Sequence, residues 1–305
     1  MIRLELPLQG AGGEPVDLRR TLNSHGFADL APLRLDEQAS TLEVTLRLRA
    51  RRPRRVRIGL AGRGRIALDV LGSSSIGART RDDVLNGARR MLRLDQDLSS
   101  FYAKAVEDPD LAWAASGAGR MLRSPTVFED VVKTVCTTNC SWSLTTRMVN
   151  ALVTELGEPA IGGDGPLTHA FPTPAAMAEQ PESFYRQAVR AGYRSPYFVA
   201  LSRLVAGGDV DLEALARAPG SEVPDDELER RLLTLPGVGP YAAAHIMMTL
   251  GRNSRLILDS WTRPTYAKLV GKRPVSDATI ARRFRRYGDH AGLAFWLVVT
   301  RDWVE

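Results

Sequence analysis

Apolar and polar residues alternate along three segments in the N-terminal quarter of the chain, at positions 41–49, 56–60 and 66–70. A period of two is typical of strands with one buried face. The segments Arg51-Arg52-Pro53 and Gly62-Arg63-Gly64 separate them and favour turns, so we expect an antiparallel meander. One helix is expected near residues 16–24. The Ser-rich loop after Gly72 ends this region, and we assign residues 1–78 to an N-terminal domain.

From residue 79 onward the pattern changes to the 3.6-residue period of amphipathic helices. Thr80 is a candidate N-cap for a helix with Val84, Ala88 and Met91 on its apolar face. The Gly- and Pro-rich segment 158–173 is expected to be a loop. Further helices are expected from Pro125, from Trp142 to Leu156 with Gly157 as the C-cap, and from Pro174, Pro181, Ser195, Asp225, Tyr241, Ser260, Ser276 and Ala291. The pattern predicts an α+β protein, in which an N-terminal antiparallel sheet domain precedes an all-α, two-lobed domain at 79–305.

Charge adds a first indication of the partner. The 305 residues carry a formal net charge of +6, and only four of the basic residues are lysine: Lys104, Lys133, Lys268 and Lys272. Excess cations favour a nucleic-acid partner, because phosphate neutralisation releases counterions. A G+C-rich genome would give the same arginine content. The arginines between Arg47 and Arg57 fall on the polar phase of the strands, so we expect a solvated sheet face there.

Other classes of protein are disfavoured by what the chain lacks. No apolar run approaches the roughly 18 residues needed to cross a bilayer, and the first residues form no signal-peptide core, so we expect a cytoplasmic protein. The two cysteines, Cys136 and Cys140, are too few for an iron–sulfur cluster or a disulfide framework. The four histidines are scattered. We expect buried, reduced thiols and no metal held by side chains.

A Gly-x-Gly turn is the first candidate for a binding element. Leu235-Pro236-Gly237-Val238-Gly239 separates an amphipathic stretch from the Ala-rich stretch that begins at Tyr241. Both glycines permit positive φ and close approach of a ligand to the backbone. Unpaired N–H groups at the start of the next helix form an anion site, which a phosphodiester suits. A plain helix–turn–helix corner is the alternative.

A single acid follows this turn by twenty residues, in Leu258-Asp259-Ser260-Trp261. The apolar run before it delivers Asp259 to the start of a predicted helix, where the helix dipole favours a carboxylate. For Asp259 taken alone, a role as the N-cap of this helix is the default interpretation.

The hairpin and the acid together resemble the helix-hairpin-helix/Gly-Pro-Asp superfamily of DNA glycosylases over residues 80–305. The N-terminal sheet resembles that of its 8-oxoguanine and alkyladenine (AlkA-type) branches. The resemblance implies that Asp259 is the catalytic carboxylate and that residues 235–239 hold the DNA backbone. It also implies that Asn139, Tyr193 and Arg194 fill the gap left by an extruded base and contact the opposite base. Helix C-cap and turn roles are the alternatives for these three.

Departures from the family pattern indicate the reaction and the substrate. Tyr241 stands where members with lyase activity carry a nucleophilic lysine, which predicts simple hydrolysis. His245 occupies the position at which 8-oxoguanine glycosylases have a cysteine. Phe295 occupies the position of the glutamine that, in those enzymes, hydrogen-bonds the edge of 8-oxoguanine. Leu144 replaces an arginine that contacts the opposite cytosine. With Trp261, the residues Tyr241, His245 and Phe295 form the expected base pocket, and its aromatic character favours N-alkylated purines.

We therefore expect a monofunctional glycosylase of base excision repair that flips a damaged purine out of double-stranded DNA. An 8-oxoguanine glycosylase and a non-catalytic DNA-binding protein are the alternatives. No cofactor is expected, although the resemblance allows K⁺ or Na⁺ on the hairpin carbonyls. We expect a monomer with no membrane partner.

Overall fold

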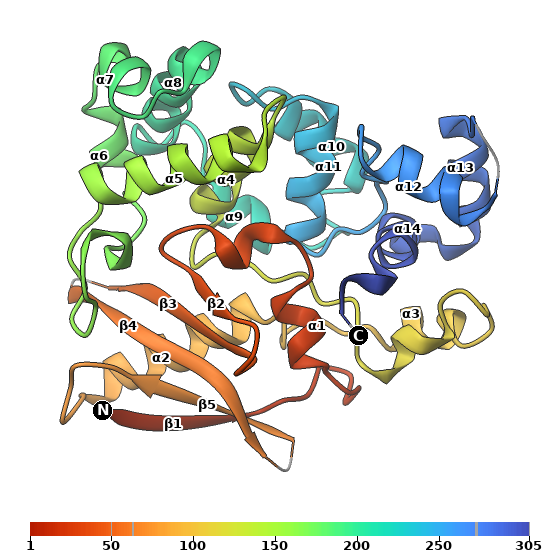
Figure 1. Ribbon diagram of the computed structural model, residues 1–305, viewed down its shortest axis with the longest axis horizontal. Helices are drawn as coiled ribbons and strands as arrows, with labels where there is room; N and C mark the ends of the chain where they lie inside the picture. The colour runs from red at the N-terminus through yellow and green to blue at the C-terminus, as the bar shows by residue number, and fades with distance from the viewer. Residues whose placement is uncertain (50, 63, 272–273, 305) are drawn as a thin grey trace.

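An antiparallel sheet at one end of the molecule and a larger helical body above it make up the computed structural model (Figure 1). It describes residues 1–49, 51–62, 64–271 and 274–304. Within these residues the sheet has the order β1-β5-β4-β3-β2. Its strands are β1 (Ile2–Pro7), β2 (Arg34–Asp36), β3 (Thr41–Leu48), β4 (Arg51–Gly62) and β5 (Arg65–Val70).

The predicted meander is confirmed as β3-β4-β5, in which Val44 pairs with Val56 and Ile58 with Leu68. The first predicted turn, Arg51-Arg52-Pro53, is wrong, because these residues already belong to β4 and Arg51 pairs with Leu48. The second predicted turn includes Arg63, which lies outside the described residues. Two edge strands were not predicted. β1 pairs with β5 and β2 pairs with β3. β2 is only three residues long, too short for an alternating pattern to be visible.

The polar face of the sheet is covered, so the expectation of a solvated arginine face is wrong at its centre. Arg55 is 2% exposed and lies beside Glu43 and Thr45. Arg47 donates to Glu158 and to the carbonyl of Phe171, both in the predicted loop 158–173. This loop packs over the sheet, where its polar atoms satisfy side chains that would otherwise need water.

Helix α2 (Ala78–Met91) covers the apolar face of the sheet with Val84, Ala88 and Met91, as the periodicity predicts. Its N-cap is Gly77, so the prediction of Thr80 as the cap is wrong. Thr80 is buried in the first turn and accepts a hydrogen bond from Arg51. Because α2 packs on the strands, the hydrophobic core of the sheet extends past the proposed boundary at residue 78.

The helical body agrees closely with the predicted starts. α5 runs from Trp142 to Leu156 and has Gly157 as its C-cap. The short helices α1, α3 and α9 complete the set, and only α1 had been expected. The helices are α1 (Leu18–Leu22), α3 (Ser99–Ala105), α4 (Val127–Thr137), α5 (Trp142–Leu156), α6 (Pro174–Ala178), α7 (Glu182–Gln187), α8 (Ser195–Ala206), α9 (Leu212–Arg217), α10 (Asp225–Leu233), α11 (Pro240–Thr249), α12 (Thr262–Leu269), α13 (Asp277–Phe284) and α14 (Ala291–Val299). In the described part of the chain no helix is long and apolar enough to span a bilayer.

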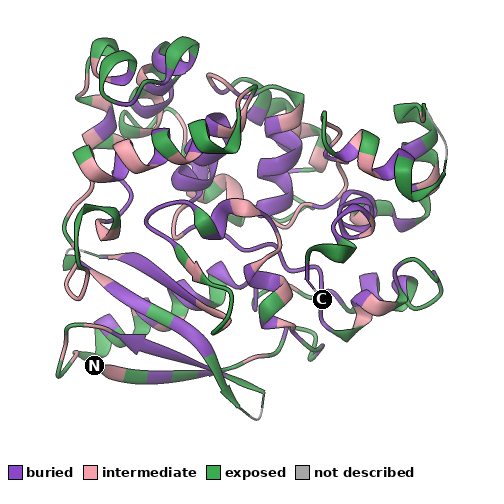
Figure 2. Cartoon of the chain, viewed as in Figure 1, coloured by how far each residue is buried: buried purple, intermediate pink, exposed green. Residues whose placement is uncertain are grey.

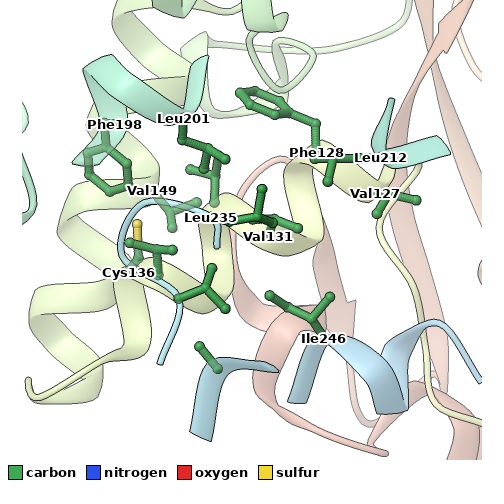
Figure 3. Close-up of a cluster of buried hydrophobic side chains, with 14 of the residues drawn as sticks. Val127, Phe128, Val131, Cys136, Val149, Phe198, Leu201, Leu212, Leu235 and Ile246 are labelled. Atoms are coloured by element: carbon green, nitrogen blue, oxygen red, sulfur yellow. The ribbon is translucent and has the colours of Figure 1, made fainter. Parts of the chain in front are cut away.

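Two hydrophobic cores meet at α11, which is buried from Ala242 to Thr249 (Figure 2). Ala243 and Ile246 face a core shared with α4, α5, α8 and α10 (Figure 3). Ala244 and Met248 face a second core shared with α3, α12, α13 and α14. A helix that is apolar on all sides is a central helix. Its small alanines let both sets of helices approach closely.

Candidate active site

The predicted hairpin joins α10 to α11, and its two glycines differ in conformation. Gly237 has φ +81°, and a Cβ built on it would lie 3.1 Å from Tyr197 and from Val135. Gly239 has φ −98° and ψ −175°, which any residue adopts, and a Cβ there would meet no atom of the protein. The expectation of positive φ is therefore confirmed for Gly237 and wrong for Gly239.

The hairpin is anchored by its apolar residues and leaves backbone donors free. Leu235 and Val238 are buried in the first helical core. Among the described residues, none accepts a hydrogen bond from the N–H of Gly237 or of Gly239. Gly239 is exposed at the N-terminus of α11. Free N–H groups at a helix start form an anion site.

Asp259 is fixed at the start of α12 by a reciprocal set of hydrogen bonds. Its Oδ1 accepts from the N–H of Trp261 at 2.8 Å and of Thr262 at 2.7 Å. The buried hydroxyl of Thr262 accepts from the N–H of Asp259 and donates to the carbonyl of Ile257. These bonds involve only Oδ1 of the carboxylate and leave Oδ2 available. They close the turn that leads into α12, whose N-cap is Trp261, so the alternative of Asp259 as the N-cap is wrong.

A cavity of about 1240 Å³ brings the hairpin and Asp259 together. The end of α4, the segment 25–27, and the last helix also contribute to its lining. Among the described residues that line it, Asp259 is the only Asp, Glu, Lys or Arg. The described lining therefore contributes one carboxylate and no neutralising Lys or Arg side chain.

Ten of the other 24 described residues that line the cavity have aromatic side chains. Tyr241 and His245 lie one turn apart on α11, with ring centroids 6.2 Å apart. Trp261 packs against Trp303 at 5.2 Å and against Trp296 at 6.1 Å. The structure thus places three of the four predicted pocket residues, Tyr241, His245 and Trp261, on the cavity.

Phe295 is the exception, and its assignment to the pocket is wrong. Its side chain is fully buried in the second helical core, packed on Phe284 and Tyr266. The next residue of α14, Trp296, lines the cavity instead. Neighbouring positions on a helix point in directions about 100° apart. The resemblance did not fix the alignment of this helix to within one residue, so it could not tell Phe295 from Trp296.

Burial shifts the pKa values of three side chains on this part of the cavity, those of His245, His25 and Tyr241. Desolvation lowers the pKa of His245 to about 3, and the neighbouring His25 adds to the effect. Desolvation also lowers the pKa of His25 to about 4. The pKa of Tyr241 is raised, mainly by burial. Both imidazoles and the phenol are therefore neutral near pH 7.

The three residues predicted to fill the gap left by the extruded base and to contact the opposite base lie together beside the cavity. Asn139 is exposed with φ +45°, and its amide donates to the Tyr193 hydroxyl at 3.4 Å. Tyr193 is 50% exposed, and both residues line the cavity. Arg194 is buried: its Nε donates to Val135 and Thr138, and its guanidinium stacks on Tyr193 at 4.5 Å. In this arrangement Arg194 supports Tyr193 from behind.

Several lining residues were missed by the sequence analysis: His25, Phe27, Trp142, Trp296 and Trp303. One signal was available: Trp296 and Trp303 are seven residues apart, a spacing that brings two positions to one face of a continuous helix. In the structure α14 ends at Val299, and Trp303 lies in the 3-10 turn Arg301–Trp303. His25-Gly26-Phe27 gave no such signal, and its place in the cavity is set by packing, since a Cβ on Gly26 would lie 2.6 Å from the Trp142 ring.

The two cysteines differ in burial. Cys136 is buried, and burial raises its pKa to about 12. Cys140 is half-buried, and its Sγ lies beside the Cys136 carbonyl. In the parts of the chain that the structure describes, no three or more His, Cys, Asp or Glu residues are grouped to hold a metal ion.

Comparison with known proteins gives relatives of two kinds. No family model matches the chain. It is 31% identical over 209 residues to the N-glycosylase/DNA lyase OGG1 of Arabidopsis thaliana. The aligned region spans 64% of this chain and 55% of that protein. It is 23% identical over 170 residues to the DNA-3-methyladenine glycosylase of Bacillus subtilis, spanning 55% and 54%. The matches thus cover about half the length of these relatives.

Two solved structures share the fold over almost the whole chain. The 8-oxoguanine glycosylase/lyase of Clostridium acetobutylicum has a TM-score of 0.72 at 18% identity and covers 98% of this chain and 96% of its own. The 3-methyladenine DNA-glycosylase of Archaeoglobus fulgidus has a TM-score of 0.73 at 18% identity and covers 100% of both. At these identities the structural likeness establishes the fold. Together with the sequence relatives, it confirms the resemblance to the helix-hairpin-helix/Gly-Pro-Asp glycosylases at the level of the superfamily.

Proposed function

We propose that this protein is a DNA glycosylase of base excision repair that hydrolyses the N-glycosidic bond of a damaged purine. One observation carries the proposal. Asp259 is the only charged side chain among the described residues that line an aromatic cavity, and that cavity adjoins a hairpin with free backbone N–H groups. The relatives, which are glycosylases of both kinds, support it.

The hairpin is suited to hold the DNA backbone. A phosphate at Gly237 and Gly239 meets N–H donors without partners and the positive end of the α11 dipole. The empty space where a Cβ of Gly239 would lie permits close approach. Such contacts position the duplex and carry no sequence information. By the resemblance, hairpin carbonyls can also hold K⁺ or Na⁺, and no step here depends on that ion.

Base flipping brings the target nucleotide into the cavity. Unstacking costs a few kcal/mol, which residues inserted into the duplex offset in part. Tyr193 and Asn139, exposed beside the cavity, are placed for this role. The flipped base then stacks among aromatic side chains while its sugar approaches Asp259.

Asp259 supplies the charge that the transition state needs. Cleavage of the N-glycosidic bond builds positive charge on the sugar, and a carboxylate stabilises it electrostatically. Oδ1 is held by two backbone N–H groups, so Oδ2 can face C1′ or orient the attacking water. Among the described residues that line the cavity, no cation competes for this charge.

Hydrolysis without strand cleavage follows from the absence of an amine. Tyr241 occupies the lyase position, and no lysine lines the cavity among the described residues. Lys133 is fully buried and paired with Glu129 at 2.6 Å. Because a Schiff base requires an uncharged amine at C1′, the reaction should stop at the abasic site. The sequence relative from Arabidopsis thaliana is named as a lyase, which makes this point worth direct measurement.

An N-alkylated purine is the substrate that the cavity favours. Such a base is cationic, and aromatic faces attract cations by about 0.5–2 kcal/mol. The single carboxylate and the tryptophans Trp261, Trp296 and Trp303 suit that charge. 8-Oxoguanine is the second candidate, because glycosylases for each lesion are among the similar proteins.

A lesion panel tests the proposal directly. Purified protein is incubated with duplexes that contain 3-methyladenine, 7-methylguanine or 8-oxoguanine, and half of each sample is treated with alkali. Strand cleavage only after alkali, on the methylated duplexes, is the expected result. Cleavage without alkali, with a complex trapped by borohydride, would contradict hydrolysis without lyase activity. No release from any duplex would favour a non-catalytic DNA-binding protein.

A further inference from the structure

His245 takes part in a hydrogen-bond chain that determines which of its ring nitrogens carries the proton. Its Nδ1 lies 3.3 Å from the hydroxyl oxygen of Thr134. That hydroxyl lies 2.7 Å from the backbone carbonyl of Asp130, one turn earlier on α4. Both side chains are buried, so water does not compete for these bonds.

The backbone carbonyl of Asp130 sets the donor-to-acceptor direction of these hydrogen bonds. We infer that the single Thr134 hydroxyl proton points to Asp130, because a carbonyl oxygen only accepts and this contact, at 2.7 Å, is much shorter than the 3.3 Å contact with His245. The Thr134 oxygen is then an acceptor toward His245, and Nδ1 must carry a proton. Because burial keeps the imidazole neutral, the other nitrogen, Nε2, carries a lone pair.

The ring is held so that this lone pair is its remaining polar feature. Phe27 and His25 pack on it, with centroids at 5.1 and 5.4 Å. His25 is itself fixed by the Leu122 carbonyl at 2.7 Å from its Nε2. His245 lines the cavity, and no described residue forms a hydrogen bond with its Nε2.

We propose that His245 is a specificity residue that presents Nε2 to the flipped base as a hydrogen-bond acceptor, with Thr134 as the positioning residue that fixes the tautomer. The cavity then selects a purine with an N–H donor on the edge that meets His245, such as the 6-amino group of an alkylated adenine. This proposal rests on the proposed glycosylase function and narrows its substrate. A base that offers only an acceptor there leaves two lone pairs facing each other, which costs affinity.

Nitrogen-15 NMR of the histidine side chains tests the tautomer without any DNA. The His245 signal is assigned by its loss in His245→Phe. In the wild-type protein at pH 7 we expect protonated Nδ1 and unprotonated Nε2. Thr134→Val should shift the balance toward the Nε2–H tautomer, and Thr134→Ser, which keeps the hydroxyl, should restore it. An Nε2–H tautomer in the wild-type protein would overturn the proposal.

Binding to a matched pair of bases tests the selectivity. One duplex contains 3-methyl-3-deazaadenine, which is not released, and the other contains the same base without its 6-amino group. The wild-type protein should prefer the first by about tenfold, the value of one good hydrogen bond. His245→Phe should lose that preference, while His169→Asn, outside the cavity, should keep it. Equal ratios in wild-type and His245→Phe proteins would overturn the proposal.

The two experiments separate this inference from the proposed function. If the wild-type protein releases no base from the lesion panel, the proposed function fails, while the NMR result still stands or falls by itself. If it releases alkylated bases and His245→Phe discriminates the matched pair as well as wild-type protein does, only the role of His245 is wrong.

Discussion

Two walls of the cavity are held in place by different forces. The hairpin wall, residues 237–245 with Asp259, is fixed by backbone geometry: a positive-φ glycine, a buried helix and reciprocal N–H bonds at Asp259. The tryptophan wall, Trp261, Trp296 and Trp303, is fixed by ring stacking and by contacts with residues 20–27. Backbone hydrogen bonds fix the position of a charge, whereas stacked rings provide a large apolar contact area. The first wall thus suits chemistry and the second suits recognition of a base.

The largest effect should come from the one charge of the hairpin wall. Asp259→Asn keeps an oxygen that can accept from Trp261 and Thr262, so the start of α12 should be preserved. It removes the negative charge that stabilises the sugar, and base release should fall on the order of a thousandfold. Single-turnover rates on the best lesion of the panel measure this.

Asp277→Asn is the matched control, since Asp277 pairs with Arg263 and does not line the cavity. It should retain the wild-type rate and duplex affinity. Turnover that persists in Asp259→Asn would show that another group supplies the charge, and the separation of roles between the two walls would fail with it.

The second effect separates the two glycines of the hairpin. Gly237→Ala places a Cβ at positive φ and 3.1 Å from two neighbours, so the free energy of unfolding should fall by about 1–3 kcal/mol. Gly239→Ala should leave stability unchanged within roughly 0.5 kcal/mol, because its backbone is extended and its surroundings are open. It should instead weaken binding of damaged and undamaged duplex alike. Urea denaturation and binding isotherms check both; a Gly239→Ala loss confined to damaged duplex would place the loop in the base pocket.

The contrast between the walls also explains what the sequence predicts well. The hairpin wall comes from one short part of the chain, so Asp259 was found from its spacing after the hairpin, and Tyr241 and His245 were found from the family resemblance that this spacing carries. Gly239 was misjudged because a Gly-x-Gly pattern does not tell which residue takes positive φ. The tryptophan wall joins distant segments, and Phe295 was chosen over Trp296 because the rotation of α14 is set by its packing on Phe284. The buried Arg55 was missed because a loop far along the chain covers it.

The third prediction concerns the contact between segment 20–27 and the hairpin wall, where His25 and His245 meet. Both folded-state pKa values lie below the unfolded value of about 6.5, so the neutral form is favoured in the folded protein. Their contribution to stability is complete above pH 6.5 and is lost as pH falls toward 4. As pH falls through that window, protonation of each histidine in the unfolded state should lower the free energy of unfolding by about 1.4 kcal/mol per pH unit.

Comparison of variants isolates this effect from other groups. Burial raises the pKa of Asp130 to about 7, which changes stability in the opposite sense over the same range. Between pH 6 and 4.5, the free energy of unfolding should depend less steeply on pH in His245→Phe than in the wild-type protein, by the equivalent of about one bound proton. Denaturation at a series of pH values measures this slope. An unchanged slope would mean that His245 is already protonated in the folded protein at pH 6.

The tryptophan wall depends on an anchor outside the helical body. Arg20 of α1 donates to the carbonyls of Val304 at 2.7 Å and Arg301 at 3.2 Å, and its guanidinium stacks on Trp113 at 4.3 Å. These bonds hold the segment that carries Trp303 against Trp261. The Trp296 indole donates to the Ser24 carbonyl at 2.8 Å. The N-terminal region therefore shapes the cavity as well as supporting it.

Removing rings from this wall should give the smallest effect and the most selective one. Trp303→Ala leaves Asp259 and the hairpin untouched but removes a stacking surface, so affinity for lesion-containing duplex should fall by about tenfold. Affinity for undamaged duplex should not change, because no base occupies the cavity there. Arg20→Ala should give a weaker loss in the same direction, since the ring remains and only its anchor is removed, whereas Arg20→Lys keeps one donor and should lie between. Binding isotherms on matched duplexes decide the point: an equal loss on both duplexes would mean that Trp303 contacts the DNA backbone, and the division between a catalytic wall and a recognition wall would no longer describe this cavity.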